Sequence, residues 1–307
     1  MKIVVLGGGA MGSLFGGYLS RSADVTIVDV NEALVKNVRE NGVTVLEKDG
    51  SRTICRPDAV TDTAGMEPAD LVIVFVKAMF SKSALTANKG IIGADTYLMT
   101  LQNGSGHEDT LLEFADKEHV IIGTTQHNSS VESMGTVRHG GSGHTYLGVL
   151  TGDVSRLQKF ADVMNEGGLE ASVSTEVLHM IWNKMFTNVS ASVLTGILQC
   201  PLGFIYKDEY ARQICRQLVM EAVAVAKGEG LDFDAAEKIE EVENVCKNAP
   251  EGYTSIYADL RDGRKSEVDT ISGSIVRASE RNGVPAPTHR LMVSLVHAME
   301  DRKREEK

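Results

Sequence analysis

The sequence predicts two domains: an α/β domain with a parallel sheet over residues 1–174, and an all-α domain over residues 175–307. Three observations lead to this division. Continuous Val, Ile and Leu runs recur in the first half, as in strands that are buried on both faces of a sheet. These runs alternate with helical patterns, which is typical of a doubly wound parallel sheet. After about residue 175 the β-branched runs vanish and long helical patterns dominate.

The expected elements of the first half begin with a strand over 2–6 (KIVVL) and a helix over 10–20. A second strand over 24–29 (DVTIVD) precedes a helix over 33–41. Further apolar runs continue the expected sheet: VTVLE (43–47), LVIVFV (71–76), YLMTL (97–101), VIIG (120–123) and TYLGV (145–149). The stretch 124–144 is rich in Gly, Ser and His, and predicts a loop with a hairpin at the sheet edge.

The second half predicts helices only. Their expected ranges are 176–198, 207–230, 234–247, 253–262, 266–282 and 288–305. Pro285 and Pro287 separate the last two helices, because proline cannot continue a helix interior.

The composition excludes several classes of protein. Of the 307 residues, 42% are hydrophobic and 24% are charged, which is ordinary for a globular protein. The 31 Lys plus Arg against 42 Asp plus Glu give a net charge of −11, which argues against nucleic acid as the main ligand. The four cysteines lack CxxC spacing, so neither a disulfide framework nor a metal site is expected. No secretory signal or membrane span is evident, and we expect a cytoplasmic protein without a membrane partner.

A glycine pattern follows the first expected strand. Gly7, Gly9 and Gly12 in GGGAMG match GxGxxG between that strand and the next helix. Such glycines permit a tight turn, close approach of a pyrophosphate to the backbone, and close packing of helix against strand. Ala10 and Met11 lie at the helix N-terminus, where backbone N–H groups are free to bind phosphate.

Asp29 closes the second strand, 20 residues after Gly9. An acid at this place accepts the hydroxyl groups of the adenosine ribose. The alternative is a glycine-rich turn with an unrelated aspartate, but position, context and spacing agree. The first domain is therefore predicted to be a Rossmann-type domain that binds a dinucleotide. Nicotinamide is favoured over flavin because no second flavin-like motif follows.

Two polar residues come directly after buried strands. Lys77 follows the run 71–76, and Asn103 follows the run 97–101. The carboxyl ends of parallel strands are where ligands bind in such sheets. The alternatives are a surface lysine and a turn-forming Asn-Gly pair.

An apolar and a polar stripe run side by side along the expected helix 176–198. The apolar stripe repeats every four residues as Met185, Val189 and Val193. The polar stripe repeats at the same spacing as Lys184, Asn188 and Ser192. A lysine, an amide and a hydroxyl in a row can grip a carboxylate or donate a proton. The alternative is an exposed polar face, although such a face normally carries several charges and this stripe carries one.

Glu267 lies at the start of the expected helix 266–282, whose apolar face is Val268, Ile271 and Ile275. An acid in the first turn stabilises a helix through the helix dipole, so Glu267 has a structural interpretation beside a functional one.

Together these motifs resemble the ketopantoate reductase (2-dehydropantoate 2-reductase) family over nearly the whole chain. The matching segments, in order, are KIVVLGGGAMG, DLVIVFVKA with Lys77, LQNGSG with Asn103, WNKMFTN with Lys184 and Asn188, TSIYADLRDGRKSEVD with Ser255 and Glu267, and NGVPAPTH at 282–289. The spacing of 12 residues between Ser255 and Glu267 also resembles that of the family. Each motif alone is unspecific, but their order is specific.

The resemblance implies that the chain reduces 2-dehydropantoate to pantoate with NAD(P)H, in pantothenate and coenzyme A biosynthesis. Lys184 would be the general acid, with Glu267 as a second catalytic residue. The implied substrate-binding residues are Asn103, Asn188, Ser192 and Ser255. The implied coenzyme-binding residues are Gly7, Gly9, Ala10, Met11, Gly12, Asp29, Lys77 and Asn103. A nearby ammonium can stabilise and protonate the oxygen as hydride adds to a ketone carbon.

Two departures from the family pattern leave alternatives open. The family usually places a basic residue after the second strand to meet the 2′-phosphate of NADPH, but here Val30 and Asn31 follow Asp29. This favours NADH. Ser192 stands where the family often has a second asparagine. The substrate is therefore expected to be a small anionic 2-oxo acid, with a reductase of another 2-oxo acid or imine, or a non-catalytic dinucleotide sensor, as alternatives. A homodimer is compatible with the helical half.

Overall fold

The computed structural model describes residues 1–305, and the chain divides into two compact units. The first unit comprises Met1–Gln102 and His107–Met180, and the second comprises Asn103–Gly106 and the chain from Ile181 onward. The sequence predicted the boundary between the two domains between residues 174 and 175. It did not anticipate that the turn Asn103–Gly106 packs with the helical unit.

The first unit is built on an eight-stranded sheet with the order β12-β11-β8-β7-β6-β1-β2-β5. The strands are β1 (Lys2–Leu6), β2 (Asp24–Val28), β5 (Asp58–Val60), β6 (Leu71–Val74), β7 (Tyr97–Thr100), β8 (Val120–Thr125), β11 (Thr145–Val149) and β12 (Ala171–Val173). All neighbouring pairs are parallel except β11 with β8. The Rossmann-type sheet is therefore confirmed as mostly parallel, with one departure: the strand 145–149 is parallel to β12 but antiparallel to β8.

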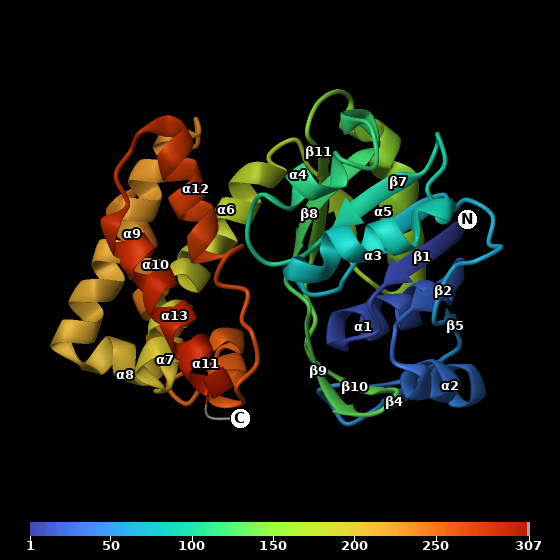
Figure 1. The fold of residues 1–307 in the computed structure, drawn as a ribbon, viewed down its shortest axis with the longest axis horizontal. Coiled ribbons are helices and arrows are strands. Elements are labelled where there is room, and N and C mark those ends of the chain that lie inside the picture. The colour runs from blue at the N-terminus through green and yellow to red at the C-terminus, as the bar shows by residue number, and fades with distance from the viewer. Residues whose placement is uncertain (306–307) are drawn as a thin grey trace. The chain divides into compact units, whose positions relative to one another are not determined.

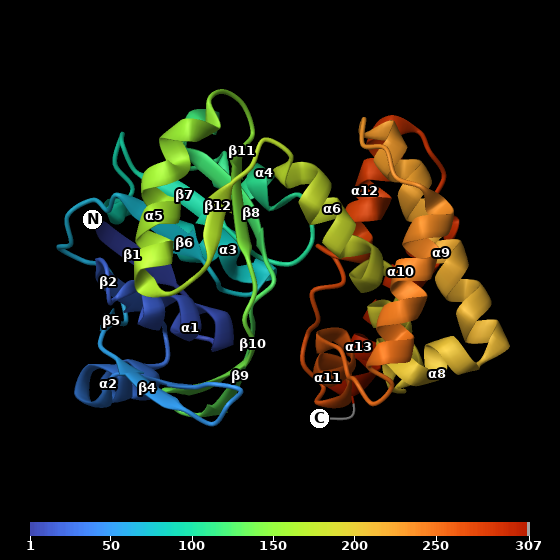
Figure 2. The same cartoon turned by 180° about the vertical axis from the view of Figure 1, so that it is seen from behind.

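Helices cover both faces of this sheet. They are α1 (Ala10–Leu19), α2 (Glu32–Asn41), α3 (Ser81–Ala87), α4 (His107–Leu111) and α5 (Gln158–Gly167). Figures 1 and 2 show α3 and α5 on opposite faces of the sheet. Coverage on both sides explains why β1 and β6 consist almost entirely of buried aliphatic residues. Short 3₁₀ turns also occur at Ala78–Phe80, Lys89–Ile91, Lys117–His119 and Val154–Leu157.

A second, four-stranded sheet with the order β4-β3-β10-β9 packs against α1. Its strands are β3 (Val43–Leu46), β4 (Arg52–Cys55), β9 (Asn128–Ser133) and β10 (Thr136–Gly141). The assignment of 43–47 to the large sheet is therefore wrong. Val43 and Val45 are fully buried because they face α1. An apolar run in the sequence indicates that a strand is buried, but it does not indicate which strand it pairs with.

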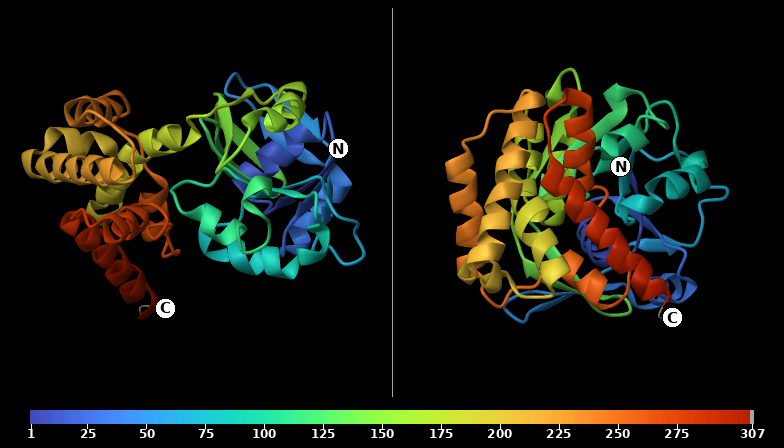
Figure 3. Two further views of the ribbon diagram at one scale, coloured as in Figure 1. Left: turned by 90° about the horizontal axis from the view of Figure 1, so that it is seen from above. Right: turned by 60° about the vertical axis from the view of Figure 1, so that its left-hand side comes forward.

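The second unit is helical, as expected (Figure 3). Its helices are α6 (Val177–Thr187, whose first turn groups with the first unit), α7 (Val193–Leu198), α8 (Leu202–Lys207), α9 (Glu209–Gly228), α10 (Ala235–Asn248), α11 (Ser255–Arg261), α12 (Ser272–Asn282) and α13 (Pro287–Glu305). A π-helical turn, Asn188–Ser192, joins α6 to α7 without a break. None of the helices in residues 1–305 is both long enough and apolar enough to cross a bilayer.

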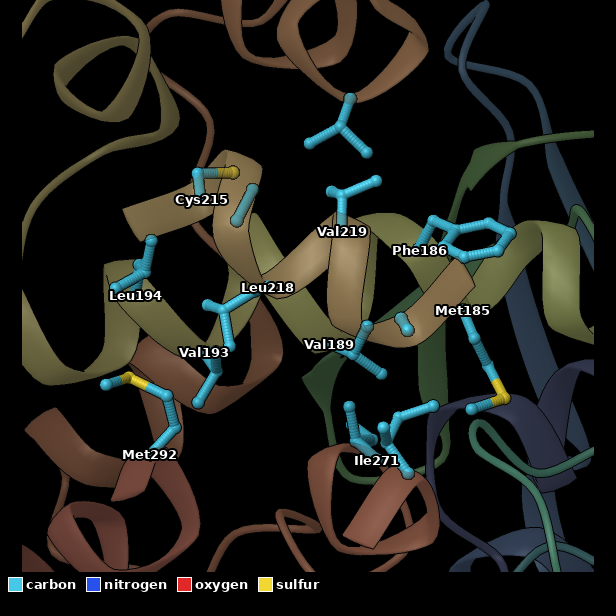
Figure 4. Close-up of a cluster of buried hydrophobic side chains, with 14 of the residues drawn as sticks. Met185, Phe186, Val189, Val193, Leu194, Cys215, Leu218, Val219, Ile271 and Met292 are labelled. Carbon is cyan, nitrogen blue, oxygen red and sulfur yellow. The ribbon is translucent and has the colours of Figure 1, made fainter. Parts of the chain in front are cut away.

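The apolar stripe of the long helical segment forms the centre of the second core. Met185, Val189 and Val193 are 2%, 0% and 0% exposed. Figure 4 shows them among side chains from other helices, including Leu218 of α9 and Met292 of α13. This packing confirms the predicted apolar face.

One predicted helix begins later than expected. Residues 266–282 were expected to be helical throughout, but α12 begins at Ser272. The carbonyl of Thr270 accepts from the Ser105 N–H at 3.1 Å, and the Ser274 N–H bonds instead to the carbonyl of Ile271. Glu267 therefore lies in an irregular turn before the helix, so the interpretation of Glu267 as a first-turn residue is wrong.

Candidate functional site

Steric contacts explain two of the glycines in the loop after β1. Gly7 has φ +103°, and a Cβ there would lie 2.7 Å from the backbone N of Val76. A Cβ on Gly12 would lie 1.8 Å from the carbonyl oxygen of Gly7, so α1 starts in direct contact with the loop. A Cβ on Gly9 would meet no protein atom within 4 Å. Packing within the protein therefore does not require a glycine at position 9.

The N-terminus of α1 presents backbone donors beside this open space. Gly9 caps the ten-residue helix without a side-chain hydrogen bond. Ser13, one turn later, donates from its N–H to the carbonyl of Gly9 at 2.8 Å and from its hydroxyl to the carbonyl of Gly8 at 2.7 Å. The N–H groups of the first turn, which include those of Ala10 and Met11, have no acceptor in the preceding turn of the helix. Together with the helix dipole, they suit a pyrophosphate.

The carboxylate of Asp29 is fixed beside the loop. The Gly8 N–H donates to Oδ2 at 2.7 Å, and the Asn31 N–H donates to Oδ1 at 2.9 Å. A carboxylate oxygen has more than one lone pair, so both oxygens keep capacity to accept from ribose hydroxyls.

A cavity of about 410 Å³ adjoins Asp29. Its lining residues come from the glycine loop, the start of α2 and the β9–β10 hairpin: Gly8, Gly9, Ser13, Asp29, Asn31, Leu34, Val131, Ser133, Met134, Gly135 and Val137. Within the described part of the chain, these lining residues include no lysine or arginine. Lys36, the nearest basic residue in sequence, pairs with Glu40 at 4.0 Å and lines a different hollow together with Arg39. The cavity thus contains one carboxylate and no positive side chain.

The end of β6 meets the glycine loop, as predicted for the carboxyl edge of the sheet. Gly7 approaches Val76, and the half-buried Lys77 is the next residue. Gln102 donates from Nε2 to the carbonyl of Val76 at 2.6 Å, which ties the end of β7 to the end of β6.

In the second unit, the turn containing Asn103 lies against the turn containing Glu267. Gly104 has φ +104°, and a Cβ there would lie only 2.0 Å from the carbonyl oxygen of Thr270. The N–H groups of Thr270 and Ile271 both donate to the carbonyl of Glu267 at 3.1 Å. The structure therefore brings Asn103 next to the segment of Glu267, although 164 residues separate them in sequence (267 − 103).

The polar stripe of the long helical segment does not follow regular α-helical spacing. Lys184 lies in α6, but Asn188 opens the π-helical turn and Ser192 ends it. In a π turn the hydrogen bonds run from residue i to i+5, so the turn is wider than the predicted one. The buried hydroxyl of Ser190 donates to the carbonyl of Phe186 within this region. π turns of this kind are frequent at functional sites.

Lys184 has an exposed side chain, yet desolvation lowers the pKa of its ammonium to about 8. The two observations agree if water reaches the side chain while surrounding protein atoms displace part of its hydration, which disfavours the charged form. An ammonium with such a pKa is mostly protonated at pH 7 and releases its proton more readily than an ordinary lysine.

Ser255 is the first residue of α11 and is exposed. Thr254, the N-cap of α11, lies 2.8 Å (Oγ1 to Oγ1) from Thr195 of α7, and Thr195 donates to the carbonyl of Ser192 at 2.8 Å. The structure therefore places Ser255 next in the chain to a residue that is linked to Ser192. Sequence reasoning missed Thr195 and Thr254, because no local pattern marks hydroxyls that pair across 59 residues.

A buried polar network between α1 and the small sheet was also missed. The Tyr18 hydroxyl donates to Glu47, whose other oxygen lies 2.8 Å from Nδ1 of His139. His139 Nε2 lies 2.9 Å from Nδ1 of His127. Burial, with the neighbouring His139 as a second cause, lowers the pKa of His127 to about 4. If His139 donates to the Glu47 carboxylate from Nδ1, its Nε2 accepts from His127, and both rings are neutral.

The chain matches two family models that together cover most of its length. Residues 3–152 match "Ketopantoate reductase PanE/ApbA", and residues 176–300 match "Ketopantoate reductase PanE/ApbA C terminal". A 2-dehydropantoate 2-reductase of Halobacterium salinarum is 30% identical over 299 residues, which are 96% of this chain and 98% of that protein.

Solved structures agree with these matches. A D-mandelate dehydrogenase in a ternary structure with NADH and anilino(oxo)acetate superposes with a TM-score of 0.91 at 31% identity, over 99% of both chains. A PanE/ApbA family ketopantoate reductase from Ralstonia eutropha has a TM-score of 0.89 at 27% identity, over 99% of this chain and 100% of that chain. The chain therefore belongs to the ketopantoate reductase PanE/ApbA family and is an oxidoreductase.

Proposed function

We propose that this chain reduces 2-dehydropantoate to pantoate and uses NADH as its preferred coenzyme. The observation that carries the proposal is Lys184: an ammonium with a pKa lowered to about 8, on a helical segment that also bears Asn188 and Ser192. A proton donor of this kind, beside neutral hydrogen-bond donors, suits a ketone that accepts hydride next to a carboxylate.

In the proposed reaction the first unit holds the coenzyme. The N–H groups at the start of α1 bind the pyrophosphate over Gly9, and Asp29 accepts from the ribose hydroxyls. Lys77 lies at the carboxyl end of β6, where it assists binding near the nicotinamide. When bound, the nicotinamide supplies the hydride.

The second unit holds the 2-oxo acid and delivers the proton. Lys184 stabilises the negative charge that grows on the ketone oxygen and then protonates it. The amides of Asn103 and Asn188 and the hydroxyls of Ser192 and Ser255 donate to the substrate oxygens. Glu267 accepts from a substrate hydroxyl.

The preference for NADH follows from the cavity beside Asp29. A 2′-phosphate placed there would meet a carboxylate and no basic lining residue. The like-charge contact and the lost ribose hydrogen bonds both disfavour NADPH. The D-mandelate dehydrogenase that resembles this chain was solved with NADH, which agrees with the proposal.

A second candidate function is the reduction of an aromatic 2-oxo acid. Two observations favour it: the likeness to D-mandelate dehydrogenase, and Ser192, which leaves a shorter side chain than the asparagine that is frequent in the family. Both functions use the same proton donor and differ in the substrate side chain.

The test is an absorbance assay of NADH and NADPH oxidation with 2-dehydropantoate, 2-oxo-2-phenylacetate and pyruvate. We expect the highest kcat/KM with 2-dehydropantoate and NADH. A higher value with the phenyl compound would replace the first function with the second. Coenzyme binding without turnover of any oxo acid or imine would support a sensor and overturn both.

A further inference from the structure

A pair of threonine hydroxyls, of a buried and a half-buried residue, connects two of the candidate substrate-binding segments. Thr195 lies in α7 and is 0% exposed, and Thr254 directly precedes α11. Their Oγ1 atoms are 2.8 Å apart. Neither residue has a part in the proposed reaction, so their hydroxyl groups need another explanation, because a buried hydroxyl is costly unless it is hydrogen-bonded.

The distances indicate how the hydrogens are arranged. Thr195 Oγ1 lies 2.8 Å from the carbonyl oxygen of Ser192, whereas Thr254 Oγ1 lies 3.4 Å from it. The shorter distance assigns the Thr195 proton to that carbonyl. The Thr254 hydroxyl then donates to Thr195 and accepts from the Tyr257 N–H at 3.3 Å. Each hydroxyl donates once and accepts once, so the chain of hydrogen bonds is complete.

One end of this series of hydrogen bonds is Thr254, the N-cap of α11. An N-cap side chain sets where a helix begins and how its first residues are oriented. Ser255 is the first residue of that helix. At the other end, the Ser192 carbonyl closes the π-helical turn that bears Asn188 and Ser192. The hydrogen-bond chain therefore joins the backbone of one candidate segment to the start of the other.

We propose that Thr195 and Thr254 are positioning residues, which fix Ser255 relative to Ser192 so that both hydroxyls meet one substrate carboxylate. This inference rests on the proposed function, since it assumes that these serines bind a 2-oxo acid. It adds a cause for their alignment: a displacement of about 1 Å at a binding group is enough to impair a reaction severely.

Apolar packing holds the two helices together independently of the hydroxyls. A Cβ on Gly196 would lie 2.5 Å from Cγ2 of Ile256, and Ile256 and Leu260 are 1% and 4% exposed. Removal of one hydroxyl is therefore expected to leave α11 docked on α7. What is lost is the directional link at the first turn, where Ser255 lies.

The test is a comparison of Thr195→Val, which keeps the shape and removes the hydroxyl, with Thr195→Ser, which keeps the hydroxyl. We expect Thr195→Val to raise KM for the 2-oxo acid about tenfold, as for the loss of one buried hydrogen bond. We expect kcat to stay within about twofold and KM for the coenzyme to stay unchanged, because ground-state binding alone is affected. Thr195→Ser should restore KM for the oxo acid.

Thr86→Val is the matched control, because the Thr86 hydroxyl donates to the carbonyl of Lys82 within its own helix and links no second segment. It should leave both KM values unchanged. If Thr195→Val does not fold, Thr254→Ala against Thr254→Ser carries the same test. A normal KM in the variants without the hydroxyl, or equal impairment in the serine variants, would overturn the positioning role. Failure of the proposed function is distinguishable, since the unmodified protein would then turn over no 2-oxo acid while still binding NADH in calorimetry.

Discussion

The glycine loop of the first unit and the candidate polar residues of the second unit depend on different kinds of interaction. The loop comprises Gly7–Gly12 and depends on backbone contacts: a Cβ on Gly12 would lie 1.8 Å from a carbonyl oxygen. The candidate polar residues of the second unit are Asn103, Lys184, Ser255 and Glu267, which come from distant parts of the chain. The hydrogen bond of the Ser105 N–H to the Thr270 carbonyl holds the turn of Asn103 against the segment of Glu267. The glycine loop therefore depends on close backbone packing, whereas each polar residue contributes its own chemical group.

This difference predicts how substitutions should affect each region. A steric arrangement has little tolerance, so one added methyl group in the loop should abolish binding. Groups that contribute separately should fail separately, with a distinct effect on kcat or on KM for each residue. Substitutions can therefore test whether the two regions behave as the contrast requires.

The largest effect is expected for Gly12→Ala. The added Cβ conflicts with the backbone of Gly7, so we expect the variant to bind no coenzyme detectably and to unfold at a lower temperature. Gly9→Ala, whose Cβ meets no protein atom within 4 Å, should keep the unfolding temperature and still lose coenzyme affinity. Calorimetric NADH titration and thermal melts measure both, with Gly90→Ala as the control in open space. Normal NADH affinity of Gly9→Ala would show that the space over Gly9 is not the phosphate site.

The next largest effect is expected for the candidate polar residues of the second unit. Lys184→Ala should lower kcat by ~10²–10⁴-fold, because the interaction of this group grows as charge develops on the oxygen. Ser255→Ala should instead raise KM, since a carboxylate grip is present in the ground state as well. Glu267→Ala should affect both parameters if its charge also positions Lys184. Paired steady-state kinetics with folding checked by circular dichroism decide the matter, and a folded Lys184→Ala protein with near-normal kcat would leave Lys77 as the next candidate acid.

The pH dependence of catalysis should reflect Lys184. The group must be protonated to act as an acid, and desolvation lowers its pKa to about 8 from the ordinary 10.5. We therefore expect kcat/KM to fall by about tenfold per pH unit above about pH 8, with a steady level below. The measurement is a kcat/KM profile from pH 6 to about 10 with saturating coenzyme. A profile that stays level beyond pH 9 would contradict the lowered pKa.

A moderate effect is expected for coenzyme choice. Asp29 and the absence of a basic lining residue in the described cavity should favour NADH over NADPH by roughly ten- to a hundredfold in kcat/KM. Asp29→Ser with Asn31→Arg should narrow or invert this ratio, because Asn31 also lines the cavity. Ala33→Arg, at an exposed position of α2 outside the lining of that cavity, is the matched control. A clear preference of the unmodified protein for NADPH would defeat the argument.

The smallest effect concerns stability in acid, to which one histidine of each unit contributes. Burial lowers the pKa of His127 in the first unit and of His289 in the second to about 4, from 6.5. Because the unfolded chain binds these protons more readily, each histidine contributes stability that is complete above pH 6.5 and is lost as the pH falls toward 4. Urea melts at pH 7 and pH 5 should therefore show less acid loss for His127→Gln and for His289→Gln than for the unmodified protein. Equal acid loss in all three proteins would exclude these residues as the cause.

Most of the first unit could be predicted from sequence because its signals are local. The strand at Lys2–Leu6, the helix from Ala10 and the carboxylate of Asp29 were identified from adjacent residues, and the structure has each where expected. The small sheet was not separated from the large one. Val43 and Val45 were correctly expected to be buried strand residues. They are buried by α1, and burial inside the large parallel sheet would have given the same apolar pattern.

The sequence by itself determined the glycine loop, the strand–helix–strand–helix order of residues 2–41, and the apolar stripe of the long helical segment. Each of these depends on residues within a few positions of one another. Only the tertiary structure decided that the Gly104 turn lies on Thr270, that Asn188 and Ser192 are the two ends of a π turn, and that Thr195 meets Thr254. The physical reason is that these arrangements depend on carbonyls and hydroxyls whose partners are far away in sequence. Every residue has a backbone carbonyl, so the local sequence pattern does not indicate which distant donor it will bond to.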